Sequence, residues 1–435
     1  MNYYSTENRQ LKRSLKDAVL EGLAPDGGLY MPEQIPVLPK EQLLSFRNKT
    51  FVEISREIAI HCFGGDLPEP DIADITNSAI NFDAPLVEVE KGIHSLELYH
   101  GPTLAFKDVG ARFMARMLGH LTGGLKRDIN VLVATSGDTG SAVASGFWNV
   151  EGVRVFILYP SGGVSHLQEK QLTTLGGNIT ALEISGTFDD CQRMVKSAFR
   201  DSDLTGKLIL TSANSINLAR LLPQSFYYFN AWARLPEDGE FYISVPSGNF
   251  GNLTAGLIAG KMGLPVKHYI VATNVNDVVP EYFETGIFRP RPSISTIANA
   301  MDVGNPSNFA RILDLYGNSL SAIRIAMSAF AYKDDELRES LGDVYRRTGY
   351  LMDPHGAAAY RALKQYYSEN PVITNEFPGV FIETAHPGKF SLTVEEVIES
   401  TIEIPDRLKD ASSKQKSSIP LSTDFGEFKN FLLNF

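Results

Sequence analysis

One lysine is the residue of this sequence best suited to covalent chemistry. Lys107 lies in the segment 100–108 (HGPTLAFKD), which opens a stretch with apolar residues at helical spacing. A cation at a helix N-terminus opposes the helix dipole, and burial beside Phe106 removes its hydration, so both effects lower the pKa of the amine. A lysine with a lowered pKa can act as a Schiff-base nucleophile. The alternative is a solvated lysine in the first turn of a surface helix.

Two loops rich in glycine and hydroxyl residues predict anion-binding sites. They are residues 135–141 (TSGDTGS) and residues 246–252 (PSGNFGN), and each follows an apolar run and precedes a helical pattern. Free backbone N–H groups at a helix N-terminus favour a phosphate or carboxylate, and glycine lets the backbone approach it. Either loop alone is also compatible with an ordinary strand-to-helix turn. Two such loops in one sheet favour a ligand with two anionic groups.

A third polar segment, residues 214–220 (NSINLAR), follows another apolar run. Asn214, Ser215, Asn217 and Arg220 fall within two helical turns and can converge on one oxyanion. The planar guanidinium of an arginine suits phosphate. Helix capping together with a surface arginine is the competing interpretation.

Several other kinds of site are excluded by residue spacing. The glycine loops lack the GxGxxG pattern of dinucleotide-binding proteins, and residues 256–262 depart from the P-loop pattern. The eight histidines form no HExxH or HxxxH pair for zinc, and no GxSxG segment offers a serine nucleophile. Cys62 and Cys191 lie far apart without CxxC spacing, so we expect neither a metal site nor a disulfide framework, and a reducing cytosol fits best.

Alternating strands and helices are predicted after about residue 126. The β-branched runs predicted as strands are residues 129–134, 153–159, 179–184, 207–210, 241–245 and 266–272. Amphipathic stretches such as 164–175 and 189–199 lie between them. This order implies right-handed βαβ crossovers and a mostly parallel sheet with helices on both faces. Ligands of such sheets gather at the carboxyl ends of the strands, where both glycine loops lie.

The composition is that of a globular protein with an acidic balance. The chain has 435 residues, 43% of them hydrophobic and 21% charged, with a net charge of −11. Its basic residues are scattered, which argues against nucleic acid or an anionic membrane as the main partner. No apolar run approaches the roughly 20 residues needed to span a bilayer. Residues 1–22 lack the apolar stretch of a secretory signal, so we expect mature sequence.

Residues 1 to about 95 are broken by prolines and are expected to form an accessory domain, with helical packing in 41–63.

In combination, these motifs resemble the threonine synthase family, pyridoxal-phosphate enzymes of fold type II, in the longer form found in many bacteria and fungi. Residues 100–108 are similar to its HGPTxAFKD lysine motif, 135–140 to its SGDTG loop, 214–220 to its NSIN…R segment and 247–251 to its SGNFG phosphate loop. Further matches are residues 24–32, 301–308, 353–356 and 383–390. The resemblance spans nearly the whole chain.

The resemblance implies an α/β fold of the tryptophan synthase β type. Two parallel-sheet lobes with helices on both faces would follow an N-terminal accessory domain at residues 1–95. Residues 96–435 would form the catalytic core. Within it, about 110–230 would be the smaller, mobile lobe, and 96–109 with 231–435 the larger lobe.

The resemblance also implies roles for individual residues. Lys107 is the expected catalytic residue, which forms the Schiff base with pyridoxal 5'-phosphate and later moves protons. The other cofactor-binding residues would be Phe106, Gly248, Asn249, Phe250, Gly251, Asn252 and Thr384, with the turn 247–252 around the cofactor phosphate and the Thr384 hydroxyl facing the pyridine nitrogen. The expected substrate-binding residues are Ser136, Thr139 and Gly140 at the carboxylate, Asn214, Ser215 and Arg220 at the phosphate, and Asp138. Asp138 stands where shorter relatives have an Asn against the ring oxygen of the cofactor. No metal is expected.

The implied reaction converts O-phospho-L-homoserine and water to L-threonine and phosphate by γ-elimination and β-hydration, the last step of threonine biosynthesis. The protein would be a carbon–oxygen lyase acting on a phosphate. The alternatives are another fold type II enzyme with the same cofactor, either a phospho-lyase or a serine/threonine deaminase, and a non-catalytic homologue that binds small anions. We expect a cytoplasmic monomer or small homo-oligomer with a small-molecule substrate and no nucleic-acid or membrane partner.

Overall fold

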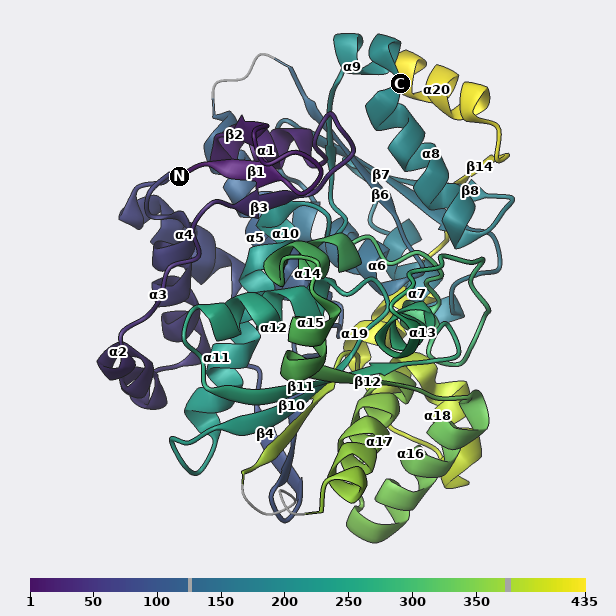
Figure 1. Cartoon of the computed structure of the whole chain (residues 1–435). Helices are drawn as coiled ribbons and strands as arrows, with labels where there is room; N and C mark the ends of the chain where they lie inside the picture. The colour runs from purple at the N-terminus through teal and green to yellow at the C-terminus, as the bar shows by residue number, and fades with distance from the viewer. Residues whose placement is uncertain (124–126, 372–376) are drawn as a thin grey trace.

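The computed structural model describes residues 1–123, 127–371 and 377–435, and its fold is built on two mostly parallel β-sheets (Figure 1). The larger sheet has the strand order β12-β11-β10-β13-β5-β4. Its strands are β4 (Leu86–Glu90), β5 (Ile93–Glu97), β10 (Phe241–Pro246), β11 (Val266–Thr273), β12 (Met327–Ala331) and β13 (Gly379–Glu383). Among the strand pairs described for this sheet, β4 with β5 is the antiparallel one.

The smaller sheet has the order β14-β8-β7-β6-β9, and its described pairs are parallel. Its strands are β6 (Ile129–Ala134), β7 (Val153–Pro160), β8 (Ile179–Ile184), β9 (Ile209–Ser212) and β14 (Ile419–Leu421). A short antiparallel sheet at the N-terminus contains β1 (Tyr3–Ser5), β2 (Lys12–Arg13) and β3 (Tyr30–Pro32). The predicted α/β architecture with two parallel sheets is therefore confirmed.

The predicted strands agree with the structure, with one shift. Residues 129–134 and 179–184 are β6 and β8 without change, and β7, β10 and β11 each extend one residue beyond the prediction. The strand predicted at 207–210 begins instead at Ile209. The reason is a short helix, α9 (Ser202–Lys207), whose first turn is capped by the Asp201 carboxylate and which includes Lys207.

Helices cover the sheets and connect their strands. The helices that follow the N-terminal region are α5 (Lys107–Thr122), α6 (Asp138–Phe147), α7 (His166–Thr173), α8 (Phe188–Arg200), α10 (Leu218–Leu221), α11 (Ser225–Arg234), α12 (Gly251–Lys261), α13 (Val278–Thr285), α14 (Phe309–Leu315), α15 (Leu320–Ala326), α16 (Asp334–Thr348), α17 (Pro354–Glu369), α18 (Ser391–Ile398), α19 (Asp406–Ser413) and α20 (Phe425–Asn434). Short 3-10 turns are η2 (Leu222–Gln224), η3 (Asn299–Met301) and η4 (Pro387–Phe390). None of the helices in the described part of the chain has the length and apolar character to cross a membrane.

The N-terminal region contains α1 (Leu15–Glu21), α2 (Lys40–Ser45), η1 (Phe46–Asn48), α3 (Phe51–Phe63) and α4 (Glu69–Ala79). The helical stretch predicted at 41–63 is divided, because Lys49 is extended and Thr50 starts a new helix with a capping box to Glu53. Apolar residues of this region share one buried core with residues of the rest of the chain. Figure 1 shows α2, α3 and α4 along one side of the molecule.

Two contacts cross the domain borders expected from the sequence. Strand β4 lies before residue 95 but pairs with β5 in the larger sheet. At the other end of the chain, β14 pairs with β8 and α20 packs against α8, so the C-terminal segment joins the smaller sheet (Figure 1). The division into domains and lobes stays a prediction.

Candidate active site

A cleft lies between the two sheets, at the carboxyl ends of their strands. It encloses about 750 Å³ of space free of protein atoms, with the solvent at its mouth included. All the predicted cofactor-binding residues line it, and so do Ser136, Thr139, Asn214, Ser215 and Arg220. Of the remaining predicted residues, Asp138 and Gly140 lie next to the cleft lining without being part of it. Motifs far apart in the sequence thus meet at one place, and the role of each residue stays a prediction.

Lys107 presents its amine to the cleft from the first turn of α5. Its Nζ lies 4.9 Å from the centre of the Phe106 ring and 4.0 Å from Oδ2 of Asp138. Burial lowers the pKa of Lys107 to about 8, although the nearby Asp138 charge opposes this shift. Lys107 therefore has a much larger neutral fraction near pH 7 than an ordinary lysine, as a nucleophilic amine requires.

The second glycine loop forms a site for an anion. Residues 247–252 connect β10 to α12, and no described residue accepts a hydrogen bond from the backbone N–H groups of 248–251. A Cβ on Gly248 would overlap the carbonyl oxygen of Ala300, so only glycine permits this close backbone approach. Unpaired N–H groups at the start of an eleven-residue helix suit a phosphate.

Asn249 connects this loop to Ser215. Its Nδ2 donates to Ser215 Oγ at 3.2 Å, and its Oδ1 accepts the N–H of Ser307 at 2.6 Å. The Asn252 amide donates to the carbonyl of Pro246 at 2.7 Å and so closes the loop on itself. The residues predicted to bind the cofactor phosphate and those predicted to bind the substrate phosphate are thereby held in one hydrogen-bonded unit.

Arg220 is a buried cation whose hydrogen-bonding capacity is not used up. It is 2% exposed, its Nη1 donates to the Ala213 carbonyl, and its Nε is buried with no partner among the described residues. Burial lowers the pKa of Arg220 to about 10. An unpaired buried guanidinium N–H is costly unless an anion accepts from it, which fits the predicted phosphate contact. The Asn214 amide instead bonds both backbone groups of Ala134 at the end of β6.

The first glycine loop is shorter than its sequence indicates, because α6 begins inside it at Asp138. Thr135 Oγ1 accepts the N–H of Gly140 at 2.7 Å, so this amide already has a partner within the protein. Ser136 and Thr139 line the cleft on this side. The carboxylate contact predicted for Ser136, Thr139 and Gly140 stays a prediction, and so does the substrate contact predicted for Asp138.

Family models match almost the whole chain. A model described as pyridoxal-phosphate dependent enzyme matches residues 84–374, and models described as threonine synthase N terminus and threonine synthase, C-terminal match residues 2–80 and 356–432. The threonine synthase of Escherichia coli is 41% identical, with 100% of both chains covered. The chain belongs to the threonine synthase family.

Solved structures of threonine synthases share this fold. The crystal structure of threonine synthase from Escherichia coli matches with a TM-score of 0.93 at 40% identity, covering 100% of both chains. The structure of threonine synthase with bound pyridoxal phosphate from Brucella melitensis matches with a TM-score of 0.91 at 34% identity, covering 100% of this chain and 99% of that chain. The expected fold type II architecture is confirmed.

The cleft fits the cofactor of the threonine synthase family, and pyridoxal phosphate is confirmed as the cofactor class. The unpaired N–H groups of 248–251 suit its phosphate, and Lys107 offers the amine for its aldehyde. Thr384, directly after β13, lines the same cleft. Its carbonyl accepts the N–H of Phe106 at 2.8 Å, which keeps the Lys107 segment next to Thr384.

Behind Thr384 lies a buried acid pair that the sequence reasoning left without a role. Burial raises the pKa of Glu383 well above its ordinary value, and the charge of Asp353 adds to this, so both effects favour the neutral form of Glu383. Burial alone would also raise the pKa of Asp353, but His355 holds it below its ordinary value. His355 lies with Nδ1 2.6 Å from Asp353, and its Nε2 accepts the N–H of Ala300 at 3.1 Å. This contact fixes the turn that packs on Gly248.

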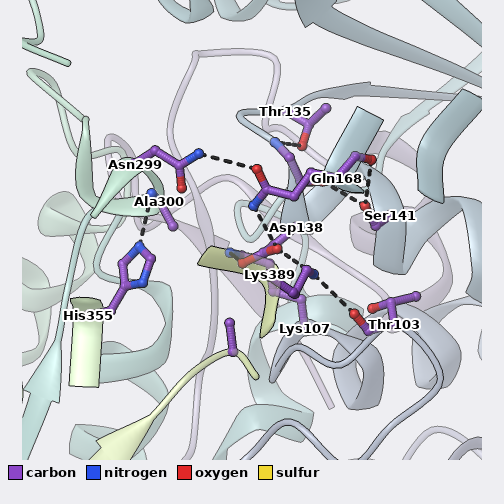
Figure 2. Close-up of polar contacts among 12 residues, drawn as sticks. Thr103, Lys107, Thr135, Asp138, Ser141, Gln168, Asn299, Ala300, His355 and Lys389 are labelled. Carbon is purple, nitrogen blue, oxygen red and sulfur yellow. Dashed lines mark hydrogen bonds and ion pairs between the residues drawn. The ribbon is translucent and has the colours of Figure 1, made fainter. Parts of the chain in front are cut away.

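Three further polar residues at the site were also missed. Lys389 contacts Asp138, and Gln168 contacts both Asp138 and Asn299 (Figure 2). Lys389 lies in the segment 383–390 that resembles the family, but no local pattern indicated its partner. Gln168 is the third residue of a capping box with Ser165, a signal that predicts a helix start and says nothing of a cleft.

Proposed function

We propose that this chain is a threonine synthase that converts O-phospho-L-homoserine and water to L-threonine and phosphate. One observation carries this proposal: the desolvated amine of Lys107 and two separate anion sites, at 248–251 and at Arg220, line one cleft in a chain whose threonine synthase relatives match it from end to end. One anion site suits the cofactor phosphate and the other suits a phosphorylated substrate.

The chain's own groups provide binding and orientation of the cofactor. When bound, pyridoxal phosphate supplies an electron sink that stabilises negative charge at the substrate carbons. The N–H groups of 248–251 would hold its phosphate, and Thr384 would present a neutral hydroxyl to its ring nitrogen. Phe106 and Asn249, which line the same cleft, would also contact it. Gly251 begins α12, and the bond from the Asn252 amide to the Pro246 carbonyl holds the loop before it.

Lys107 is the proposed acid and base of the reaction. With a pKa of about 8, its amine can accept a proton from the substrate Cα near neutral pH, and it would pass this proton to the cofactor before acting as a base again. The same amine would then take a proton from Cβ, which allows phosphate to leave from Cγ. Protonated Lys107 has Asp138 as its nearest carboxylate, at 4.0 Å.

The substrate would lie with its two anionic ends in the two polar regions of the cleft. Arg220 would donate its free Nε–H to the phosphate, with Asn214 and Ser215 beside it. Ser136 and Thr139, together with the backbone of Gly140, would bind the carboxylate. A phosphate held in this way cannot rotate away from the reacting carbons, which favours departure of the phosphate over simple loss of the amino group.

Water must stay out until the final addition at Cβ, so closure of one lobe over the other is part of the proposal. We propose 1–95 as the accessory domain, 96–435 as the core and about 110–230 as the lobe that moves. The pairing of β14 with β8 would carry the C-terminal segment along with that lobe.

The acidic net charge and two buried free cysteines support a cytoplasmic enzyme with no nucleic-acid partner, and we propose a monomer or small homo-oligomer.

The test is product analysis with O-phospho-L-homoserine as substrate. Threonine and phosphate in equal amounts, lost in a Lys107→Ala variant that still folds, are the expected result. Formation of 2-oxobutanoate in place of threonine would favour a phospho-lyase or a deaminase. No turnover by a protein that binds the cofactor would favour the non-catalytic alternative. The full-length threonine synthase relatives argue against both alternatives.

A further inference from the structure

Lys389 is a buried lysine that the proposed reaction leaves without a role. It lies in η4, just after β13 and Thr384, and its side chain is 0% exposed. Its Nζ lies 2.6 Å from Oδ1 of Asp138 and donates to the carbonyl of Thr103 at 3.0 Å. A buried ammonium without such partners would be strongly unfavourable, so this position is tied to Asp138. Figure 2 shows Lys389 and Lys107 both close to Asp138.

Asp138 therefore lies between two lysines at unequal distances. Its Oδ1 accepts from Lys389 and from Gln168 Nε2, the latter at 3.0 Å, while its Oδ2 lies 4.0 Å from Lys107. Coulomb attraction falls with distance, so Lys389 is the main counter-ion of this carboxylate. Burial alone would raise the pKa of Asp138, but the charges of Lys389 and Lys107 hold it well below its ordinary value. Asp138 thus stays ionised beside the Lys107 amine.

The same ion pair connects the two sides of the cleft. Lys389 follows β13 of the larger sheet, whereas Asp138 follows β6 of the smaller sheet. A second connection lies beside it, because Gln168 of α7 accepts from Asn299 Nδ2 at 3.2 Å (Figure 2). Gly137, with a φ of 129°, is the residue against which the Gln168 amide packs. Both connections end on or next to Asp138.

The charged groups that face Lys107 come from four elements. They are Asp138 on α6, Lys389 on η4, Arg220 on α10 and Asp353 at the start of α17. The two carboxylates favour the ammonium form of Lys107, and the two cations disfavour it. Removing Lys389 deletes one of the cations and at the same time leaves Lys107 as the nearest cation to Asp138. Both changes act in the same direction, toward a Lys107 that holds its proton.

We propose that Lys389 is a positioning residue: its buried ion pair with Asp138 joins the two sides of the cleft and takes up the carboxylate charge that would otherwise keep Lys107 protonated. This inference rests on the proposed function, because it concerns the lysine that bonds the cofactor. The Lys107 amine attacks the cofactor aldehyde with its lone pair and releases one water. Only the neutral amine can do so, and Lys389 keeps that form available.

The experiment measures cofactor uptake as a function of pH. The full-length chain is freed of pyridoxal phosphate, the cofactor is added back, and the rate of the absorbance change is followed from pH 6 to pH 10. The wild-type rate should have its midpoint near pH 8, the pKa of Lys107. Lys389→Met should move the midpoint upward and slow uptake at pH 7 about tenfold, the change that one pKa unit produces.

Matched variants separate positioning from simple packing. Lys389→Arg keeps the charge and should keep the wild-type midpoint. The double variant Lys389→Met/Asp138→Asn removes both members of the pair and should return the midpoint toward wild type, whereas a packing role predicts that the double variant is at least as impaired as the single one. Lys49→Met deletes a partly buried lysine of the N-terminal region that is ion-paired with Glu57, and it should leave the midpoint unchanged. Lys389→Gln replaces Lys389→Met if the latter does not fold.

Two results would overturn the inference. One is a folded Lys389→Met enzyme with the midpoint of wild type, and the other is a double variant that stays as displaced as the single variant. Failure of the proposed function looks different. In that case the wild-type chain would take up no cofactor, or Lys107→Ala would take it up with the same absorbance change.

Discussion

Two arginines, Arg220 and Arg311, are buried near the cleft. Replacing each of them by methionine should change the free energy of unfolding of the protein in opposite directions. Arg311 is 0% exposed and makes five hydrogen bonds, to the carbonyls of Tyr30, Ser215 and Ile216 and to Asn308. Arg220 is 2% exposed, and its Nε has no partner within the described chain. If Arg220 is kept for a substrate phosphate, the enzyme without substrate should gain stability when it is replaced.

The magnitude follows from the pKa of Arg220. Burial lowers it from 12.5 to about 10, and each pKa unit corresponds to about 1.36 kcal/mol, so holding the charge there costs roughly 3 kcal/mol. Arg220→Met removes this cost and also loses the bond to the Ala213 carbonyl, a charge-assisted bond worth about 1.5 to 3 kcal/mol. The free energy of unfolding should therefore rise by up to about 1.5 kcal/mol. Burial lowers the pKa of Arg311 further, to about 9, so its charge costs roughly 5 kcal/mol. Its five charge-assisted hydrogen bonds contribute about 1.5 to 3 kcal/mol each and outweigh this cost, so Arg311→Met should lose at least about 3 kcal/mol.

Urea unfolding without substrate, together with steady-state kinetics, tests this contrast. Arg220→Met should raise the free energy of unfolding and lower kcat/KM for O-phospho-L-homoserine by about 10- to 10²-fold, because one charge-assisted hydrogen bond to the phosphate contributes about 1.5 to 3 kcal/mol. The reasoning is refuted if Arg220→Met loses as much stability as Arg311→Met. It is equally refuted if Arg220→Met keeps the wild-type kcat/KM.

Two other predictions concern the cofactor site. Gly248→Ala directs a methyl group at the carbonyl of Ala300 and should raise the dissociation constant of pyridoxal phosphate about tenfold or more. In the control variant Gly239→Ala the added methyl group meets no neighbour within 4 Å, so this constant should stay unchanged. Equal dissociation constants for the two variants in an absorbance titration would contradict the proposed phosphate site. The pKa of Lys107 is about 8 in the folded chain against an ordinary value of 10.5, so the unfolded chain binds more protons between these pH values and stability must rise with pH across that window. From pH 8 to pH 10.5, the free energy of unfolding of the cofactor-free enzyme should increase by about 3 kcal/mol relative to that of the Lys107→Met variant. If urea unfolding gives the two proteins the same dependence of this free energy on pH, Lys107 is not desolvated.

Many strands and the glycine loops could be predicted because they depend on local sequence patterns. The runs at 129–134 and 179–184 are short, β-branched and bounded by turn residues, and both are strands in the structure. The glycine loops and Lys107 were placed at strand ends and a helix start by the same reasoning, and they line one cleft. Strand β14 was missed, because its three residues form a strand only by pairing with β8.

The polar contacts around the site could not be predicted from local patterns. The sequence around Asp138, with two glycines nearby, predicts a turn. In the structure Asp138 instead begins α6 and forms an ion pair with Lys389, which follows β13 of the larger sheet. Gln168 completes a capping box in sequence, but in the fold its amide reaches Asp138 and Asn299. Such pairs depend on how the two sheets face each other, and this orientation is set by the shared core and not by any single segment.

The most direct measurement of the proposed reaction is the fate of labelled oxygen. The enzyme is supplied with O-phospho-L-homoserine in water enriched in ¹⁸O, and the products are analysed by mass spectrometry. Elimination of phosphate followed by addition of water at Cβ predicts one ¹⁸O atom in the threonine hydroxyl and none in the phosphate, because the carbon–oxygen bond breaks. Labelled phosphate together with homoserine would show hydrolysis of the phosphate ester and would contradict the account.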